Sequence, residues 1–113
     1  MVNTKIIAIA SHKGGVGKTT TAATLGSLLS SQGKKTLLVD LDAQRNLTST
    51  FMGTKFNPEM TLYESMSRKA PLAIYEVRDY LDIVPSSLDM GALDTVIASR
   101  IQRETILRDI LRL

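Results

Sequence analysis

The chain has 113 residues, of which 43% are hydrophobic and 22% charged, and it contains no cysteine. This balance is that of one ordinary globular domain, which excludes disordered and fibrous proteins, and the missing thiols exclude disulfides and cysteine-bound metal clusters. The formal net charge of +3 favours an acidic partner only weakly, and no stretch reaches the ~18 consecutive apolar residues of a membrane-spanning helix. We therefore expect a cytoplasmic protein without a transmembrane segment.

The first predicted elements are a strand, a glycine-rich loop, a helix and a second strand. The short apolar run at residues 5–10 is typical of a strand buried on both faces. Residues 19–32 repeat apolar positions at helical spacing, and Gly33 stands where a glycine commonly ends a helix. The apolar run at residues 36–40 ends in an acid and predicts the second strand. Together these elements predict a right-handed βαβ unit with parallel strands.

The second half of the chain has weaker patterns. A short helix is expected after Thr61, and a third strand at residues 81–84, followed by Pro85. Ser86, with an acid three residues later, resembles a capping box for a further helix.

The predicted strands are few and short for a covered parallel sheet. The fold class that we expect is α/β, with a mostly parallel sheet flanked by helices. We expect residues 1–113 to be the N-terminal part of a single nucleotide-binding domain, and so an incomplete domain.

A phosphate-binding loop lies between the first strand and the first helix. The residues from Gly14 to Thr19 read G-x-x-G-K-T, and the strand before and the helix after this motif give it the context of a P-loop. Glycines let successive backbone N–H groups point at phosphate oxygens, and the helix N-terminus adds a partial positive charge. Lys18 is placed to reach the β- and γ-phosphates, and the Thr19 hydroxyl to ligate Mg²⁺. The motif therefore predicts ATP and Mg²⁺ as cofactors.

The loop departs from the full Walker spacing, because His12 stands where the first glycine is expected and Lys13 follows it. In this the sequence resembles the deviant Walker A, or ParA/MinD, P-loop ATPases, whose motif K-G-G-x-G-K-[ST] is matched from Lys13 to Thr19. The resemblance implies that Lys13 reaches across a nucleotide-bound dimer to the phosphates of the facing subunit. Taken alone, Lys13 could be a solvated loop lysine. The implied nucleotide-binding residues are Lys13, Gly14, Gly15, Val16, Gly17, Lys18, Thr19 and Thr20.

A second motif, Asp40-Leu41-Asp42-Ala43-Gln44-Arg45-Asn46, follows the second strand and resembles the family's switch I sequence D-x-D-P-Q-G-N. The resemblance implies that Asp42 orients or activates the attacking water, which makes Lys13, Lys18 and Asp42 the expected catalytic residues. It places Asp40 near the waters of the metal, although an acid at a strand end also commonly caps the next helix. Ala43 replaces the family's proline and Arg45 its glycine.

The resemblance implies a slowly hydrolysing, ATP-dependent homodimeric switch ATPase in plasmid or chromosome partitioning. Its implied partners are a ParB-like adaptor and non-specific DNA, and its implied location is the bacterial cytoplasm at the nucleoid. The alternatives are a MinD-like membrane-associated positioning ATPase and a metabolic ATP-dependent ligase or kinase. The family's Walker B strand and adenine-binding loop are expected beyond residue 113. A third possibility is therefore that this piece binds nucleotide without turnover.

Overall fold

The computed structural model describes residues 4–9, 17–68 and 70–92. The helices and strands, in chain order, are α1 (Lys18–Ser31), β1 (Thr36–Val39), α2 (Asn46–Met52), α3 (Leu62–Ser67), β2 (Tyr75–Arg78), β3 (Leu81–Val84) and the 3₁₀ helix η1 (Leu88–Ala92). The predicted helix after the glycine-rich loop and the strands at residues 36–40 and 81–84 are confirmed to within one residue at either end.

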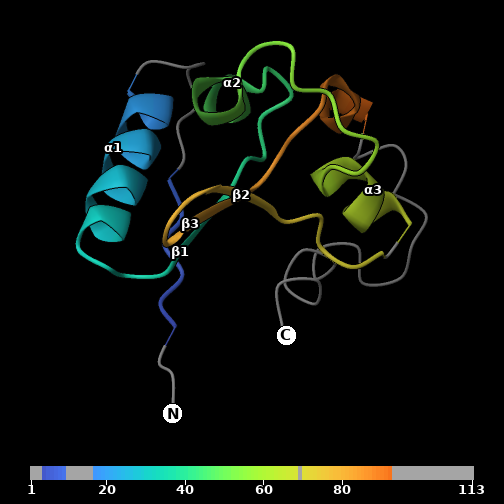
Figure 1. Cartoon of the computed structure of the whole chain (residues 1–113). Helices are drawn as coiled ribbons and strands as arrows, with labels where there is room; N and C mark the ends of the chain where they lie inside the picture. Colours follow the sequence, from blue (N-terminus) through green and yellow to red (C-terminus); the bar gives the residue numbers. More distant parts are fainter. Residues whose placement is uncertain (1–3, 10–16, 69, 93–113) are drawn as a thin grey trace.

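The described strands form a mixed sheet in the order β1-β3-β2 (Figure 1). β1 and β3 are parallel, with Thr36 opposite Leu81 and Val39 opposite Val84. β2 and β3 are antiparallel, with an irregularity between Glu76 and Arg78. The α/β class is confirmed. The strand β2, which was not predicted, adds an antiparallel pair to the expected parallel sheet.

Both faces of this sheet are covered, and each cover has its own buried cluster. One cluster consists of side chains from β1, β3 and α2, namely Leu38, Leu47, Leu81 and Ile83. Residues of α1 pack against this cluster. The other cluster joins α3 to the end of β3 and consists of Leu62, Met66 and Val84. Figure 1 shows α1 and α3 on opposite sides of the strands. Because successive strand residues point to opposite faces, Ile83 and Val84 belong to different clusters.

The strand predicted at residues 5–10 is not confirmed, because residues 4–9 lie outside the regular elements. Ile6 is 81% and Ile7 63% exposed, which is the opposite of a strand buried on both faces. A strand exists only through backbone bonds to a neighbour, and among the described residues β1, β2 and β3 pair only with one another and no backbone bond is recorded for residues 4–9. The expected βαβ unit is therefore replaced by a parallel pair, β1 and β3, that is distant in sequence.

The predicted helix ends are mostly confirmed. Gly33 has a φ of 77°, the left-handed conformation that favours glycine after a helix. At α3 the Thr61 N–H donates to Glu64 Oε1 over 2.7 Å, and the Thr61 hydroxyl accepts from the Tyr63 N–H. These two bonds form a capping box and explain why a short helix begins there.

The capping box predicted at Ser86 is wrong. The Ser86 hydroxyl donates to the Asp42 carbonyl over 2.7 Å instead of capping a helix, because both groups meet at the buried end of β3. The element that follows is the short η1, and the rest of the predicted helix, from residue 93, lies outside the described residues. Among the described helices none is long and apolar enough to cross a membrane.

Candidate phosphate site and switch loop

The N-terminus of α1 is the part of the predicted phosphate-binding loop that the structure describes. Gly17 has a φ of 83°, and a Cβ built there has no atom within 4 Å, so glycine is required by backbone conformation and not by crowding. Gly17 is the N-cap residue of α1, but it has no side chain to accept a bond from the first N–H groups, and the first turn contains no acidic residue. Lys18, Thr19 and Thr20 form that turn. Lys13, Gly14, Gly15 and Val16 lie outside the described residues.

Lys18 and Asp42 meet at this helix end, although 24 positions separate them in the sequence. The Lys18 ammonium lies 3.5 Å from Asp42 Oδ2, and the two side chains are 26% and 31% exposed. An ion pair with this partial exposure contributes up to about 1 kcal/mol. The structure thus places the predicted phosphate-binding lysine beside the predicted water-orienting carboxylate.

Backbone and side-chain bonds hold the loop that carries Asp42. The Asp42 N–H donates to Asp40 Oδ1 over 3.1 Å, and Asp42 Oδ1 accepts from the Gln44 N–H over 3.0 Å. The Asp42 carbonyl accepts from the Arg45 N–H over 2.9 Å and from the Ser86 hydroxyl over 2.7 Å. Its other carboxylate oxygen, Oδ2, is the one that faces Lys18.

Asp40 has a structural role that the sequence analysis considered as an alternative. Its side chain is 3% exposed, and Oδ2 accepts from the Thr48 N–H over 2.9 Å and from the Thr48 hydroxyl over 2.6 Å. Because Thr48 lies in the first turn of α2, Asp40 caps that helix from the end of β1. Its role at the waters of a metal stays a prediction.

Arg45 takes the position at which the family motif has glycine. Its φ is 62°, in the left-handed region, and it immediately precedes α2. Its guanidinium donates to the Phe56 carbonyl, which joins the switch loop, the segment of residues 40–46, to the segment after α2. The other departure, Ala43, lies 3.8 Å from where a Gly91 Cβ would stand, so the loop also approaches η1.

The residues present fit a nucleotide with Mg²⁺. The helix N-terminus has a glycine that leaves its N–H groups uncapped by a side chain, a lysine, and two threonines, which is the donor set that phosphate oxygens require. Within the described residues no three acidic, histidine or cysteine side chains gather at one point. A magnesium ion coordinated mainly by phosphates, water and one hydroxyl needs no such cluster. The metal role of Thr19 stays a prediction.

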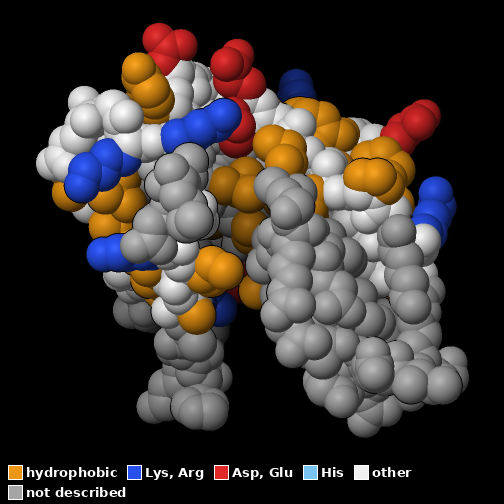
Figure 2. Space-filling model, turned by 90° about the horizontal axis from the view of Figure 1, so that it is seen from below, with side chains coloured by type: hydrophobic (Ala, Val, Ile, Leu, Met, Phe, Trp, Pro, Cys, Tyr) orange, Lys and Arg blue, Asp and Glu red, His pale blue; other side chains and the backbone are white. Residues whose placement is uncertain are grey.

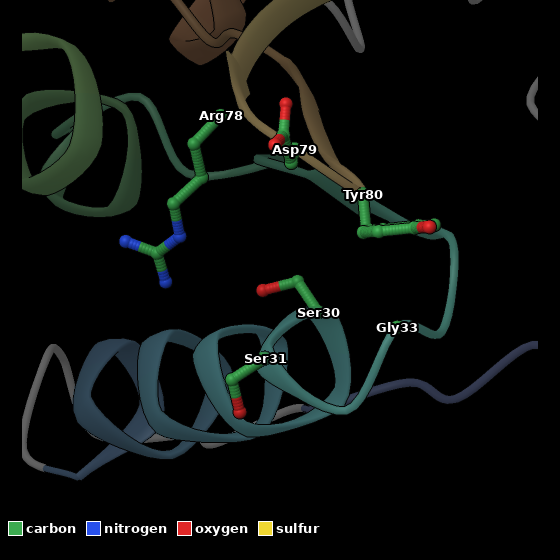
Figure 3. A pocket seen from close by; sticks show the side chains of 6 residues that line it. All are labelled: Ser30, Ser31, Gly33, Arg78, Asp79 and Tyr80. Carbon is green, nitrogen blue, oxygen red and sulfur yellow. The ribbon is translucent and has the colours of Figure 1, made fainter.

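A separate cavity of about 530 Å³ lies at the other end of α1 (Figure 3). It is lined by Ser30, Ser31, Gly33, Arg78, Asp79 and Tyr80. α1 has 14 residues, so its two ends are about 20 Å apart. The cavity is therefore not the phosphate site.

Two residues that hold the site, Thr48 and Ser86, were not predicted from the sequence. Thr48 and Ser86 are 0% and 1% exposed. The Thr48 hydroxyl donates to the Asp40 carboxylate, and the Ser86 hydroxyl donates to the Asp42 carbonyl. Ser86 follows the third predicted strand and Pro85 in the sequence, but a serine at this position equally suits a helix cap. Nothing in the sequence pairs it with a carbonyl 44 positions earlier.

A family of AAA domains matches residues 4–113. The chromosome partitioning protein ParA of Caulobacter vibrioides is 34% identical over 110 residues, which cover 95% of this chain and 41% of that protein. The chain thus spans about two fifths of the length of this curated relative.

Two solved structures are similar. Cobyrinic acid a,c-diamide synthase from Mycobacterium smegmatis, with bound ADP and magnesium, is 31% identical with a TM-score of 0.83, over 90% of this chain and 42% of that one. A plasmid partition protein from Borrelia burgdorferi is 33% identical with a TM-score of 0.75, over 91% and 47%. Together with the family match and the site, these similarities show that the chain belongs to the ParA/MinD-type P-loop ATPases.

Proposed function

We propose that this chain is the nucleotide-binding part of a ParA-type switch ATPase that acts in plasmid or chromosome partitioning. The observation that carries the proposal is the ion pair between Lys18, at the N-terminus of α1, and Asp42, on a loop bonded to β1 and β3. The partition proteins among the similar proteins support the cellular role.

ATP and Mg²⁺ are the ligands of this site in the proposal. Gly17, Lys18, Thr19 and Thr20 bind the phosphates together with residues 13–16, and the Thr19 hydroxyl ligates the metal. Bound magnesium neutralises charge on the phosphate oxygens. Lys18 exchanges its carboxylate partner for phosphate oxygens, which leaves the Asp42 carboxylate available to accept a hydrogen bond from water.

The proposed switch is an ATP-dependent homodimer in which Lys13 contacts the phosphates of the facing subunit. A second lysine would neutralise charge in the way that an arginine finger does. A ParB-like adaptor and non-specific DNA are the proposed partners, and the bacterial cytoplasm at the nucleoid is the proposed location.

A metabolic ATP-dependent ligase is the second candidate, and one observation favours it. The cobyrinic acid a,c-diamide synthase aligns with a higher TM-score, 0.83, than the plasmid partition protein, 0.75. A ligase of this kind releases ADP only when its small-molecule substrate is present, and DNA does not change its rate.

The test is ATP turnover and ATP-dependent dimerisation in the full-length protein, each with and without DNA. We expect slow hydrolysis that DNA stimulates, and about 10²- to 10⁴-fold slower hydrolysis after Asp42→Ala, with ATP binding retained. Asp79→Ala is the matched control, because this exposed carboxylate lies at the far end of α1. Unchanged hydrolysis in Asp42→Ala would overturn the role of Asp42, and indifference to DNA would favour the ligase.

A further inference from the structure

A closed ring of hydrogen bonds connects four residues from three separate segments. The Thr48 hydroxyl donates to Asp40 Oδ2 over 2.6 Å and accepts from the Ser86 N–H over 3.0 Å. The Ser86 hydroxyl donates to the Asp42 carbonyl over 2.7 Å. The Asp42 N–H donates to Asp40 Oδ1 over 3.1 Å, which closes the ring.

The ring is buried where β1, α2 and β3 meet. Asp40, Thr48 and Ser86 are 3%, 0% and 1% exposed. In such a place a polar group that loses its partner keeps the full cost of its desolvation, so each bond of the ring resists opening. Pairing between the strands continues into the ring, because the Asp40 N–H donates to the Val84 carbonyl over 3.1 Å.

Asp42 is the one ring member with a partly exposed side chain at the phosphate site. The ring engages its backbone on both sides, at the N–H and at the carbonyl, and leaves the carboxylate directed at Lys18. With both peptide groups fixed, the position of the carboxylate depends on its own two side-chain torsions and on the Gln44 N–H that Oδ1 accepts.

We propose that Ser86 and Thr48 are positioning residues, which hold the Asp42 carboxylate beside Lys18 through the buried ring. The consequence for catalysis rests on the proposed function, but the positioning itself is a property of the protein alone. Ser86 acts on Asp42 directly through its carbonyl. Thr48 acts one step further away, through the Ser86 N–H and the Asp40 carboxylate.

The test labels the intact, folded chain with a small amine-reactive acetylating ester in the absence of nucleotide. Mass spectrometry of the peptides from the labelled chain then gives the rate of acetylation at the Lys18 amine. Asp42→Asn gives the rate for a lysine without its carboxylate partner. We expect a rise of about two- to five-fold, the factor that corresponds to a partly exposed ion pair. Ser86→Ala and Thr48→Val should reproduce at least half of that rise. Thr48→Ser, which keeps the hydroxyl, should restore the original rate.

Ser87→Ala is the matched control, because the buried Ser87 hydroxyl has no hydrogen-bond partner among the described residues. The rate at Lys18 should not change in this variant. Labelling of the exposed Lys34 and Lys35 serves as an internal reference, and amide exchange at the fully buried Ile83 reports whether each variant stays folded.

An unchanged Lys18 rate in folded Ser86→Ala and Thr48→Val, beside a raised rate in Asp42→Asn, would overturn the positioning role. So would an unchanged rate in Asp42→Asn, because the ion pair would then not protect the amine. Loss of the fold in both ring variants would show that the ring holds the core and not the carboxylate, which also overturns the proposal. Failure of the proposed function is separate, since it appears in ATP turnover and ATP-dependent dimerisation, which this assay does not measure.

Discussion

At the scale of single residues, one residue of the switch loop, Arg45, has a left-handed backbone conformation that its residue type disfavours. Arg45 has a φ of 62°, which costs an L-residue roughly 1–2 kcal/mol, and the family motif has glycine at this position. The bond from its guanidinium to the Phe56 carbonyl offsets part of that cost. Arginine in place of glycine therefore strains the backbone at this position but adds a side-chain hydrogen bond that anchors the loop to the segment after α2.

The first prediction compares two substitutions that both remove this anchor. Arg45→Gly should be about 1 kcal/mol more stable towards unfolding in urea than Arg45→Ala, because only glycine adopts the left-handed conformation without strain. The neighbouring Gln44 is the control, since its φ is not positive, and there the alanine variant should be at least as stable as the glycine variant. Equal stability of the two Arg45 variants would show that the backbone at this position is not strained.

At the scale of elements, α1 packs closely on the sheet through a glycine. A Cβ at Gly26 would come within 2.9 Å of Leu38 Cδ2, and Leu38 belongs to the buried cluster that α1 covers. Glycine in a helix interior costs about 1 kcal/mol relative to alanine, so its presence here reflects contact with β1 and not helix propensity.

Gly26→Val should therefore lower the free energy of unfolding by about 1–3 kcal/mol, because the added side chain overpacks the cluster. The double variant Gly26→Val with Leu38→Ala should lose less than the sum of the two single variants, because the shortened side chain leaves room for the valine. Urea unfolding of the four proteins measures this coupling. If the two single-variant losses in free energy of unfolding add up in the double variant, the valine does not clash with Leu38.

Elements whose signals are local were predictable from the sequence. The predictions of α1, β1 and β3 rested on apolar spacing and on Gly33, and the start of α3 was expected after Thr61; these signals lie within or beside each element. β2 was not predicted because it has only four residues, which alternate in burial. The turn at Asp79–Tyr80 also lacks the glycine or asparagine that usually indicates a hairpin. The ring at Ser86 was missed because it joins residues that the chain brings together only after folding.

At the scale of the whole molecule, the least predictable feature was which strands pair. The apolar run at residues 5–10 has the composition of a buried strand, yet pairing depends on neighbours that composition does not specify.

Exposed hydrophobic side chains include Ile6, Ile7, Leu28 and Leu37. Figure 2 shows hydrophobic side chains gathered near the middle of the face seen from below, with charged side chains towards its rim.

The position of Lys18 and Asp42 in the site was more predictable than the strand pairing, because each of these residues belongs to a short sequence motif. Lys18 and Asp42 were expected at one place, and the structure brings their charged atoms within 3.5 Å. The loop that carries Asp42 follows β1, and it is bonded to the end of the parallel neighbour β3 through the Ser86 hydroxyl. The parts of the loop at residues 13–16 stay predictions, since they lie outside the described residues.

The central claim is that the N-terminus of α1 binds the phosphates of ATP, and a titration of this chain with fluorescent ATP and Mg²⁺ tests it most directly. Lys34→Ala is the matched control for Lys18→Ala, because Lys34 is exposed and lies beyond the other end of α1. We expect saturable binding that Lys18→Ala weakens about 10- to 100-fold, the effect of losing one charge-assisted bond, and that Lys34→Ala leaves unchanged. Binding that Lys18→Ala does not weaken, or no binding by the unaltered chain, would contradict the claim.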